Sequence, residues 1–120
     1  MKIMKNIVQN QKEILQNELF PRIFGKLVDE QGRCEHYHTV RDIVANRCGV
    51  CGKFYACYKC HDELENHAFG AVDEAEPETV MCGVCHMLFS YKTYSALSKC
   101  SQCGCEFNPR CALHKSCYAR

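Results

Sequence analysis

The sequence has few of the residues that usually build a protein core. It contains no tryptophan, and from residue 34 to residue 120 only 15 of 87 residues are isoleucine, leucine, valine or phenylalanine. A segment with so little apolar surface does not easily offset the entropy of ordering its chain. The sequence also has no apolar run close to the roughly 20 residues that cross a bilayer, so we expect no membrane span. The chain therefore needs a source of stability other than a large apolar interior.

An excess of charge of one sign is also missing. The chain has 15 basic and 14 acidic residues and a formal net charge of +1. Because domains that bind nucleic acid usually carry a strongly basic face, we expect no nucleic-acid partner. Lysines and glutamates interrupt the first 20 residues, so these do not form the apolar core of a secretory signal. We therefore predict a cytoplasmic protein, in a compartment that keeps thiols reduced.

Cysteine and histidine, in contrast, are abundant. The chain has 12 cysteines and 6 histidines, and all of them lie beyond residue 33. Two cysteines three residues apart can hold a tetrahedral zinc ion through a tight turn, which leaves two ligand positions for other residues. Four pairs have this spacing: Cys48/Cys51, Cys57/Cys60, Cys82/Cys85 and Cys100/Cys103. The alternative is a disulfide framework, which would not require histidines at ligand spacing. We predict that zinc stabilises the chain.

These patterns predict a small, metal-stabilised α+β fold that is irregular, with zinc knuckles, short β-hairpins and short helices. Residues 1–22 contain no cysteine or histidine and are predicted to form an N-terminal extension, helical or frayed. Residues 23–72 are predicted to form a zinc module with two interleaved sites. Residues 79–120 are predicted to form a part that resembles a zinc ribbon, with one or two sites. The acidic segment 73–78 connects the two parts.

Local signals predict individual elements. Residues 23–28 have the composition of a short strand. Asp62 and Glu65 have the spacing of a capping box, so a short helix is expected to begin at Asp62. Ser90 is expected to cap another short helix that extends to Leu97.

The clearest ligand set is Cys82, Cys85, Cys100 and Cys103. Its two pairs are separated by 14 residues, the pattern of a four-cysteine zinc site. Apolar residues flank the first pair, which predicts a hairpin with the zinc knuckle as its turn. Gly104 follows the last cysteine, at a position that commonly requires a positive φ. An iron–sulfur cluster is the alternative occupant of the same four ligands.

The first half of the chain offers eight candidate ligands, enough for two tetrahedral sites. Adjacent Cys60 and His61 are expected to serve different ions, because neighbouring side chains point apart, and this makes the two sites interleave. The preferred pairing places Cys34, His36, Cys57 and Cys60 around one ion and Cys48, Cys51, His61 and His67 around the other. Other pairings of these eight residues stay open at this stage.

Several of these segments resemble the CHY-type zinc finger family. The resemblance is carried by Cys34-Glu35-His36-Tyr37, by Tyr55-Ala56-Cys57-Tyr58-Lys59-Cys60-His61, by Cys82-Gly83-Val84-Cys85 and by Asn108-Pro109-Arg110-Cys111. It covers about residues 24 to 115. The family includes small stand-alone proteins, one of which is a yeast helper of small Tim proteins, and larger ubiquitin ligases with an added RING. The resemblance implies three zinc ions.

The chain departs from the family pattern at one ligand. Family members usually have two adjacent cysteines, whereas this chain has Val50 before Cys51. Cys48 forms a regular knuckle with Cys51, so we expect Cys48 to supply the missing ligand. The C-terminal segment also has ligand spacing, and a fourth zinc could use Cys111, His114 and Cys117 with Cys105 or His38. The alternative is that these C-terminal residues only pack the tail.

The sequence predicts a binding module and not an enzyme. Cys57 and Cys60 lack the βαβ context of a redox dithiol, and no candidate site combines an open zinc position with an acid/base residue. Three functions follow: a module that binds an unidentified protein partner, a factor that handles zinc or redox state for client thiol proteins, or an adaptor for a separate ubiquitin ligase. The resemblance to the yeast helper motivates the second.

Overall fold

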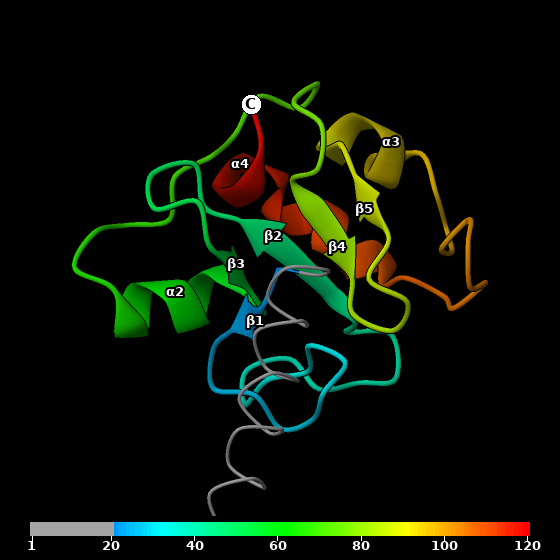
Figure 1. Ribbon diagram of the computed structural model, residues 1–120, viewed down its shortest axis with the longest axis horizontal. Helices are drawn as coiled ribbons and strands as arrows, with labels where there is room; N and C mark the ends of the chain where they lie inside the picture. The colour runs from blue at the N-terminus through cyan, green and yellow to red at the C-terminus, as the bar shows by residue number, and fades with distance from the viewer. Residues whose placement is uncertain (1–20) are drawn as a thin grey trace, which may run out of the picture.

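The computed structural model describes residues 21–120, except for the side chains of residues 110–112. The predicted N-terminal extension, residues 1–22, therefore lies outside the described residues apart from its last two. The elements follow one another along the chain as β1 (Ile23–Phe24), β2 (Val44–Arg47), β3 (Phe54–Tyr55), α2 (Tyr58–Leu64), β4 (Val80–Cys82), β5 (Leu88–Phe89), α3 (Tyr91–Ser95), η1 (Pro109–His114) and α4 (Lys115–Tyr118). Short strands and short helices with little regular structure between them confirm the predicted fold class (Figure 1).

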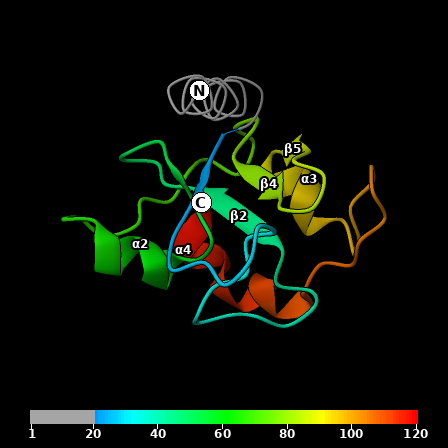
Figure 2. The same cartoon turned by 60° about the horizontal axis from the view of Figure 1, so that its bottom comes forward.

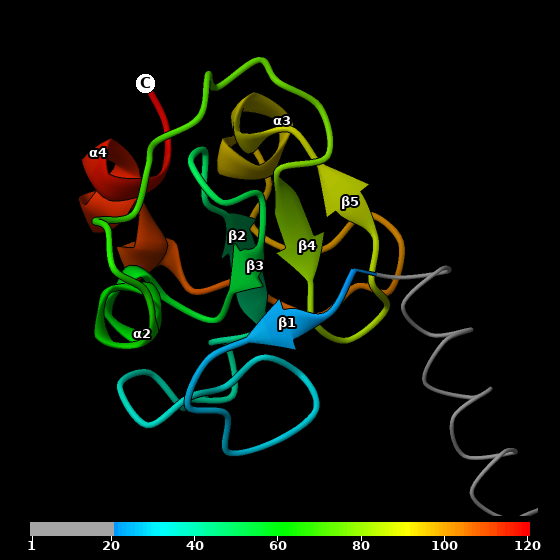
Figure 3. The same ribbon diagram turned by 60° about the vertical axis from the view of Figure 1, so that its left-hand side comes forward.

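The strands form one sheet in the order β1-β3-β2-β4-β5. Only β1 and β3 run parallel, and the other neighbours are antiparallel. β2 lies in the centre and pairs with β3 on one side and β4 on the other (Figure 3). Because β4 comes after the acidic segment 73–78, the sheet joins strands from both cysteine-rich parts of the chain.

The sheet has a small apolar cluster on each face. Side chains alternate along a strand, so neighbouring residues face opposite sides. Val44 and Val80 belong to one cluster, and Ala45 and Met81 belong to the other. The first cluster is covered by α3 and by the C-terminal segment η1–α4, which lies across this face of the sheet (Figures 1 and 2). The core thus consists of two small layers, one on each face of the sheet.

The hairpin predicted around the first knuckle of the second half is present. β4 and β5 pair with Val80 opposite Phe89 and Met81 opposite Leu88. The Cys82 amide donates to the carbonyl of Met87 over 2.9 Å, which closes the knuckle at the end of the hairpin. This prediction is confirmed.

The strand predicted at residues 23–28 is shorter than expected. β1 ends at Phe24, and the chain turns away at Gly25, which has a φ of +138°. A Cβ atom at Gly25 would lie 3.1 Å from the Cys60 sulfur. The amide of the next residue, Lys26, donates to the same sulfur over 3.4 Å. The backbone leaves the sheet here because it approaches a cysteine cluster.

The helix predicted to begin at Asp62 begins four residues earlier, so the capping-box prediction was wrong. α2 spans Tyr58–Leu64, and its N-cap is Cys57, whose sulfur accepts a hydrogen bond from the Cys60 amide over 3.3 Å. The Asp62 carboxylate instead accepts from the Phe69 amide over 2.9 Å. A cysteine knuckle thus replaces the usual oxygen cap. The cap predicted at Ser90 is confirmed, because its hydroxyl accepts from the Thr93 amide over 3.1 Å at the start of α3. The predicted end at Leu97 was wrong, because α3 spans only Tyr91–Ser95.

The C-terminus is tied to the first half of the chain. Val72 and Ala119 form a parallel bridge, with a hydrogen bond from the Val72 amide to the Tyr118 carbonyl at 3.0 Å. α4 lies beside α2 in the views of Figures 2 and 3, and the Tyr118 hydroxyl accepts from the Tyr58 amide over 3.0 Å. In the described part of the chain, no helix combines the length and apolar character of a membrane span.

Candidate metal centres

The first centre brings together Cys34, His36, Cys57 and Cys60. The Nδ1 atom of His36 lies 3.9, 3.5 and 3.4 Å from the sulfur atoms of Cys34, Cys57 and Cys60, in that order. The sulfur atoms of Cys34 and Cys57 are 3.7 Å apart. The three cysteines are buried and His36 is half-buried. α2 positions two of the ligands, because Cys57 is its N-cap and Cys60 lies in its first turn.

Polar groups around the first centre orient its ligands. The amides of Tyr37 and Lys26 donate to the sulfur atoms of Cys34 and Cys60, each over 3.4 Å. Nε2 of His36 lies 2.9 Å from a carboxylate oxygen of Glu63. A carboxylate at this nitrogen places the imidazole proton on Nε2 and leaves Nδ1 free to bind a metal.

The second centre brings together Cys48, Cys51, His61 and His67. The sulfur atom of Cys48 lies 3.7 Å from Nε2 of His67, and that of Cys51 lies 3.7 Å from Nε2 of His61. The two Nε2 atoms are 3.0 Å apart. Cys48 and His61 are fully buried. The structure therefore places Cys48 among the four ligands of the second centre. It supplies the ligand expected to be missing because Val50 stands where family members have a cysteine. Cys60 and His61 are adjacent in sequence and face different centres, so the two centres interleave.

Each histidine of the second centre also has an oxygen partner at its other nitrogen. Nδ1 of His61 lies 2.9 Å from an oxygen of Asp62, and Nδ1 of His67 lies 3.2 Å from the side-chain oxygen of Asn66. These contacts leave the two Nε2 atoms available as metal ligands. The Gly70 amide donates to the Cys48 sulfur over 3.3 Å. The loop after α2 thus closes over the second centre.

The third centre brings together Cys82, Cys85, Cys100 and Cys103. The sulfur atoms of Cys82 and Cys103 are 3.8 Å apart, and those of Cys85 and Cys100 are 3.6 Å apart. Cys82 and Cys100 are buried, Cys85 is half-buried and Cys103 is exposed. This centre holds only thiols, and it alone presents an exposed residue among the three groups of ligands.

The distances between ligand atoms fit zinc in all three centres. Zinc–sulfur bonds of about 2.3 Å and zinc–nitrogen bonds of about 2.0–2.1 Å in a tetrahedron place two sulfurs about 3.8 Å apart and a sulfur and a nitrogen about 3.5 Å apart. The sulfur–sulfur distances of 3.6–3.8 Å and the sulfur–nitrogen distances of 3.4–3.9 Å match these values. The same geometry places two nitrogen ligands about 3.3 Å apart. The two Nε2 atoms of the second centre are slightly closer, at 3.0 Å. The chain thus has three clusters able to hold zinc.

The protonation of the thiols supports the same conclusion. The hydrogen bond between the sulfur atoms of Cys34 and Cys57 lowers the pKa of Cys34 to about 5, and this bond together with burial raises the pKa of Cys57 far above its ordinary value. Burial likewise raises the pKa of Cys82, while the Cys105 amide lowers the pKa of Cys103 to about 7. Burial and the neighbouring thiols thus oppose ionisation of all the thiols of one centre together. A divalent ion would remove this conflict by favouring every thiolate.

Three of the four cysteine pairs form the same knuckle. In each, the amide of the first cysteine donates to the carbonyl five residues later over 2.9 Å, and the residue after the second cysteine donates to the carbonyl of the first over 2.8–2.9 Å. That last residue has a positive φ: +73° at Gly52, +67° at His86 and +78° at Gly104. The positive φ predicted for Gly104 is confirmed. His86 is half-buried and belongs to none of the three centres.

The residues predicted for a fourth site do not meet in the part of the chain that the structure describes. Cys105, His114, Cys117 and His38 form no group of three or more at ligand distance there, and the side chain of Cys111 lies outside the described residues. The His114 ring instead packs against Tyr37 and Tyr58, with centroids 5.9 and 5.5 Å apart. The alternative expectation, that this segment packs the tail, fits His114 better than a role as ligand.

The supporting residues Glu63, Asp62 and Asn66 were not predicted from the sequence. Glu63 and Asp62 follow His61 directly, and the capping-box interpretation assigned Asp62 to a helix terminus. The available signal was the position of carboxylates and an amide next to ligand histidines, since such histidines usually bond an oxygen through their second nitrogen. That signal does not show which histidine Glu63 serves, because His36 lies 27 residues earlier.

Comparison with known proteins agrees with this geometry. Residues 34–110 match the CHY zinc finger family. The chain is 44% identical to an uncharacterized protein of Schizosaccharomyces pombe, over 80% of this chain and 87% of that protein. It is 44% identical to Helper of Tim protein 13 of Kluyveromyces lactis, over 81% of this chain and 87% of that protein. It is 41% identical to Helper of Tim protein 13 of Saccharomyces cerevisiae, over 80% of this chain and 88% of that protein.

Proposed function

Because the chain belongs to the CHY zinc finger family, we propose that it is a zinc-stabilised module that binds and assists another protein and catalyses no reaction itself. The observation that carries this proposal is the similarity, over nearly nine tenths of their length, to two proteins named as helpers of a Tim protein. A helper acts on a protein, so the proposed partner is a protein of the Tim class. Three clusters able to hold zinc support the proposal, because bound ions would stabilise the surface that such a module needs.

A structural role for the metals supports the non-enzymatic part of the proposal. Each centre has four protein side chains at ligand distance. A catalytic zinc site usually keeps one position open for water or substrate, and a structural site is closed by four protein ligands. The resident ions would then hold the loops in place and would not activate a substrate.

A binding experiment tests the proposal. The zinc-loaded chain and a purified, reduced small Tim protein would be mixed and analysed by size-exclusion chromatography and calorimetry. We expect a complex that forms with the zinc-loaded chain and is lost when the chain is stripped of zinc. A matched mixture with an unrelated protein that contains the same number of thiols measures non-specific thiol contact. No complex, or equal binding of the unrelated protein, would refute the proposal.

A second function, zinc handling for client thiol proteins, is favoured by one observation. Cys103 is an exposed ligand in a centre made only of thiols, so a competing thiolate from a client can reach it. If the chain hands zinc to clients, one ion should pass quickly and reversibly to a metal-free thiol protein while the other two stay bound. Slow release of all ions together with unfolding would leave the binding module as the function.

The proposed location is a reducing compartment, and we retain the cytoplasm. Nine of the described cysteines belong to groups at metal-ligand distance, which supports metal ligation by thiols that stay reduced. Fractionation of cells that produce the tagged chain, with blotting of each fraction, tests this location. Recovery of the chain in an oxidising compartment would overturn it.

A further inference from the structure

A cavity of about 380 Å³ lies between one face of the sheet, the C-terminal segment η1–α4 and the loop of residues 36–42. Val44 and Asn46 of β2 line it from the sheet. Side chains alternate along a strand, so these two residues share a face, and Ala45 between them belongs to the apolar cluster on the other face. The cavity has the size of a ligand site, for which about 300–1,000 Å³ is usual.

Asn46 is the unusual residue of this cavity. It is only 7% exposed, yet its side-chain amide makes no hydrogen bond in the part of the chain that the structure describes. Every fully enclosed side-chain nitrogen or oxygen atom in that part has a partner, so the Asn46 amide borders open space, and the cavity is that space. Buried polar groups normally have partners, so this donor and acceptor are available to a ligand.

The walls of the cavity are joined by contacts of their own. One Asp42 oxygen accepts from the Asn108 side-chain amide over 2.9 Å, and the other accepts from the amide and hydroxyl of Thr39 over 2.8 and 2.7 Å. The ring packing of His114 against Tyr37 joins the same two segments a second time. The cavity is therefore formed before any ligand enters, as is usual for binding sites.

The lining favours an uncharged ligand. The described residues around the cavity include no lysine or arginine, and their one carboxylate, that of Asp42, has both oxygens engaged. The lining residue Leu113 is 79% exposed, and Val40, which follows the lining residue Thr39, is 82% exposed. Apolar side chains that remain exposed beside a cavity are typical of a surface that another protein covers.

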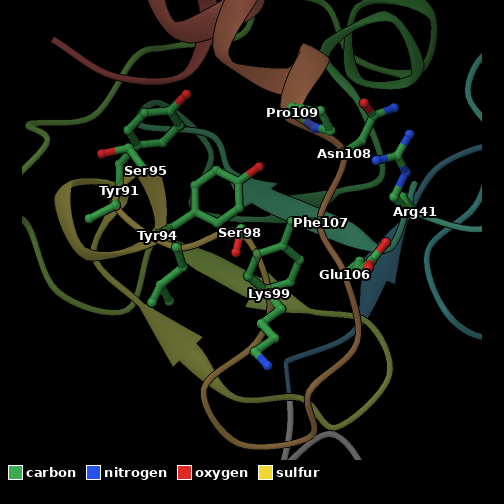
Figure 4. Close-up of a pocket in the computed structure, with 12 residues that line it drawn as sticks. Arg41, Tyr91, Tyr94, Ser95, Ser98, Lys99, Glu106, Phe107, Asn108 and Pro109 are labelled. Carbon is green, nitrogen blue, oxygen red and sulfur yellow. The ribbon is translucent and has the colours of Figure 1, made fainter.

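A larger cavity, of about 740 Å³, lies beside α3 and has a different lining. Tyr91, Tyr94 and Phe107 are buried in its wall, and Arg41 and Lys99 are exposed around it (Figure 4). Both tyrosines have interaction partners within the protein. This cavity thus serves as a control site, with aromatic rings and charges but without a buried amide that awaits a partner.

We propose that the cavity beneath η1–α4 binds an uncharged side chain from an extended segment of the partner protein, and that Asn46 hydrogen-bonds the backbone N–H and C=O of the inserted residue. The donor and the acceptor of the Asn46 amide match these two backbone groups. The identity of this occupant rests on the proposed function, in which the chain binds a protein. The site can be tested separately, because a small peptide-like molecule presents the same groups.

Titration of the zinc-loaded, isotope-labelled chain with N-acetyl-phenylalaninamide, followed by NMR, tests the site. This probe is one uncharged residue with a peptide group on each side. We expect saturable shifts around Asn46, Tyr37 and His114 and none around Tyr94 in the larger cavity. N-acetyl-lysinamide, which carries a charge, should bind more weakly. Adenosine should also bind more weakly, although a carboxamide can recognise its base.

Two variants and one control measure the contribution of each part. Asn46→Leu removes the amide at similar volume and should weaken probe binding by about tenfold or more, because the probe is left unpaired. Its melting temperature should not fall, since no hydrogen bond of the fold is lost. Leu113→Ser, at an exposed position, should weaken binding several-fold and covers the case in which Asn46→Leu disturbs β2. Val28→Ser, at an exposed apolar residue outside both cavities, should bind the probe unchanged.

Several results would overturn the proposal: no saturable binding of the probe, shifts around Tyr94 and not around Asn46, tighter binding of adenosine, or equal affinities in Leu113→Ser and Val28→Ser. The same variants would then be mixed with the reduced small Tim protein. We expect Asn46→Leu and Leu113→Ser to weaken that complex and Val28→Ser to leave it unchanged, and equal complexes from all three would also overturn the proposal. If even the unmodified chain forms no complex while the probe still fills the cavity, the proposed function fails and the peptide-binding site is retained.

Discussion

Glu63 links His36, a ligand of the first centre, to Lys26, whose backbone amide contacts another ligand of that centre. One of its oxygens lies 2.9 Å from Nε2 of His36, and the other lies 2.9 Å from the ammonium group of Lys26, whose amide donates to the Cys60 sulfur. The carboxylate thereby fixes the imidazole so that Nδ1 faces the three sulfur atoms. His36 is the ligand of this centre with the most exposure to water, so it depends most on such a support.

Glu63→Ala should therefore weaken zinc binding at the first centre. Loss of a carboxylate that orients a ligand histidine typically lowers metal affinity by about 10–100-fold. Competition titration with a chelator of known affinity measures the change, and Glu30→Ala, at another exposed acidic position, is the control. An unchanged affinity in Glu63→Ala would show that His36 needs no orienting partner.

Asp62→Ala separates the observed role of this residue from the predicted one. Its carboxylate accepts from the Phe69 amide and contacts Nδ1 of His61, so its loss should lower zinc affinity at the second centre by about tenfold or more. The helix α2 should keep its length, because its cap is the sulfur of Cys57. Titration with a chelator and amide exchange in α2 measure the two effects. Shortening of the helix with unchanged zinc affinity would restore the capping-box interpretation.

The sequence was most informative where spacing alone determines geometry. A pair of cysteines three residues apart specifies a knuckle, and the structure forms three such knuckles with the same backbone hydrogen bonds. The adjacency of Cys60 and His61 was enough to predict interleaved centres, because neighbouring side chains cannot easily bind one ion. The hairpin around Cys82 and the cap at Ser90 followed from similarly local rules.

Features that depend on distant segments were not predictable in the same way. The helix α2 begins at the knuckle and not at Asp62, because a sulfur atom held by the centre supplies the cap. β1 stops at Phe24 because the chain passes close to Cys60, which lies 36 residues later. The ring of His114, a candidate ligand by its spacing, packs against Tyr37 and Tyr58, which lie far earlier in the chain. In each case a metal centre or a remote segment determined the outcome.

The residue after each knuckle offers a test of backbone strain. A Cβ atom at Gly52 or Gly104 would meet no heavy atom within 4 Å, so substitution by alanine affects only the backbone conformation. At φ of +73° and +78°, each alanine should lower stability by about 1 kcal/mol. At His86, with φ of +67°, glycine should be more stable than alanine by a similar amount. Denaturant unfolding at a fixed free-zinc concentration measures all four variants, and equal stabilities would contradict the shared knuckle geometry.

Tyr118 tests whether the C-terminus stabilises the first half of the chain. Its hydroxyl accepts from the Tyr58 amide over 3.0 Å, and its side chain is almost fully buried. Tyr118→Phe removes the acceptor of this half-buried amide, which should cost about 1 kcal/mol. Hydrogen exchange should accelerate at the Tyr58 amide more than at amides of the β4–β5 hairpin. Equal acceleration everywhere would mean that the substitution lowers global stability without a specific effect on α2.

Removal of zinc should unfold the chain as a whole. Structural zinc ions contribute on the order of 10 kcal/mol each in small zinc domains, whereas whole domains are stable by only about 5–15 kcal/mol. The two apolar clusters are thin and include ligand cysteines, among them Cys34 and Cys82, so the core and the centres cannot be lost separately. We expect stepwise addition of a strong chelator, with reductant present, to remove the tertiary circular dichroism signal and amide protection together. A metal-free chain that stays compact with free thiols would show that the apolar clusters suffice, and the structural role argued for the three centres would be wrong.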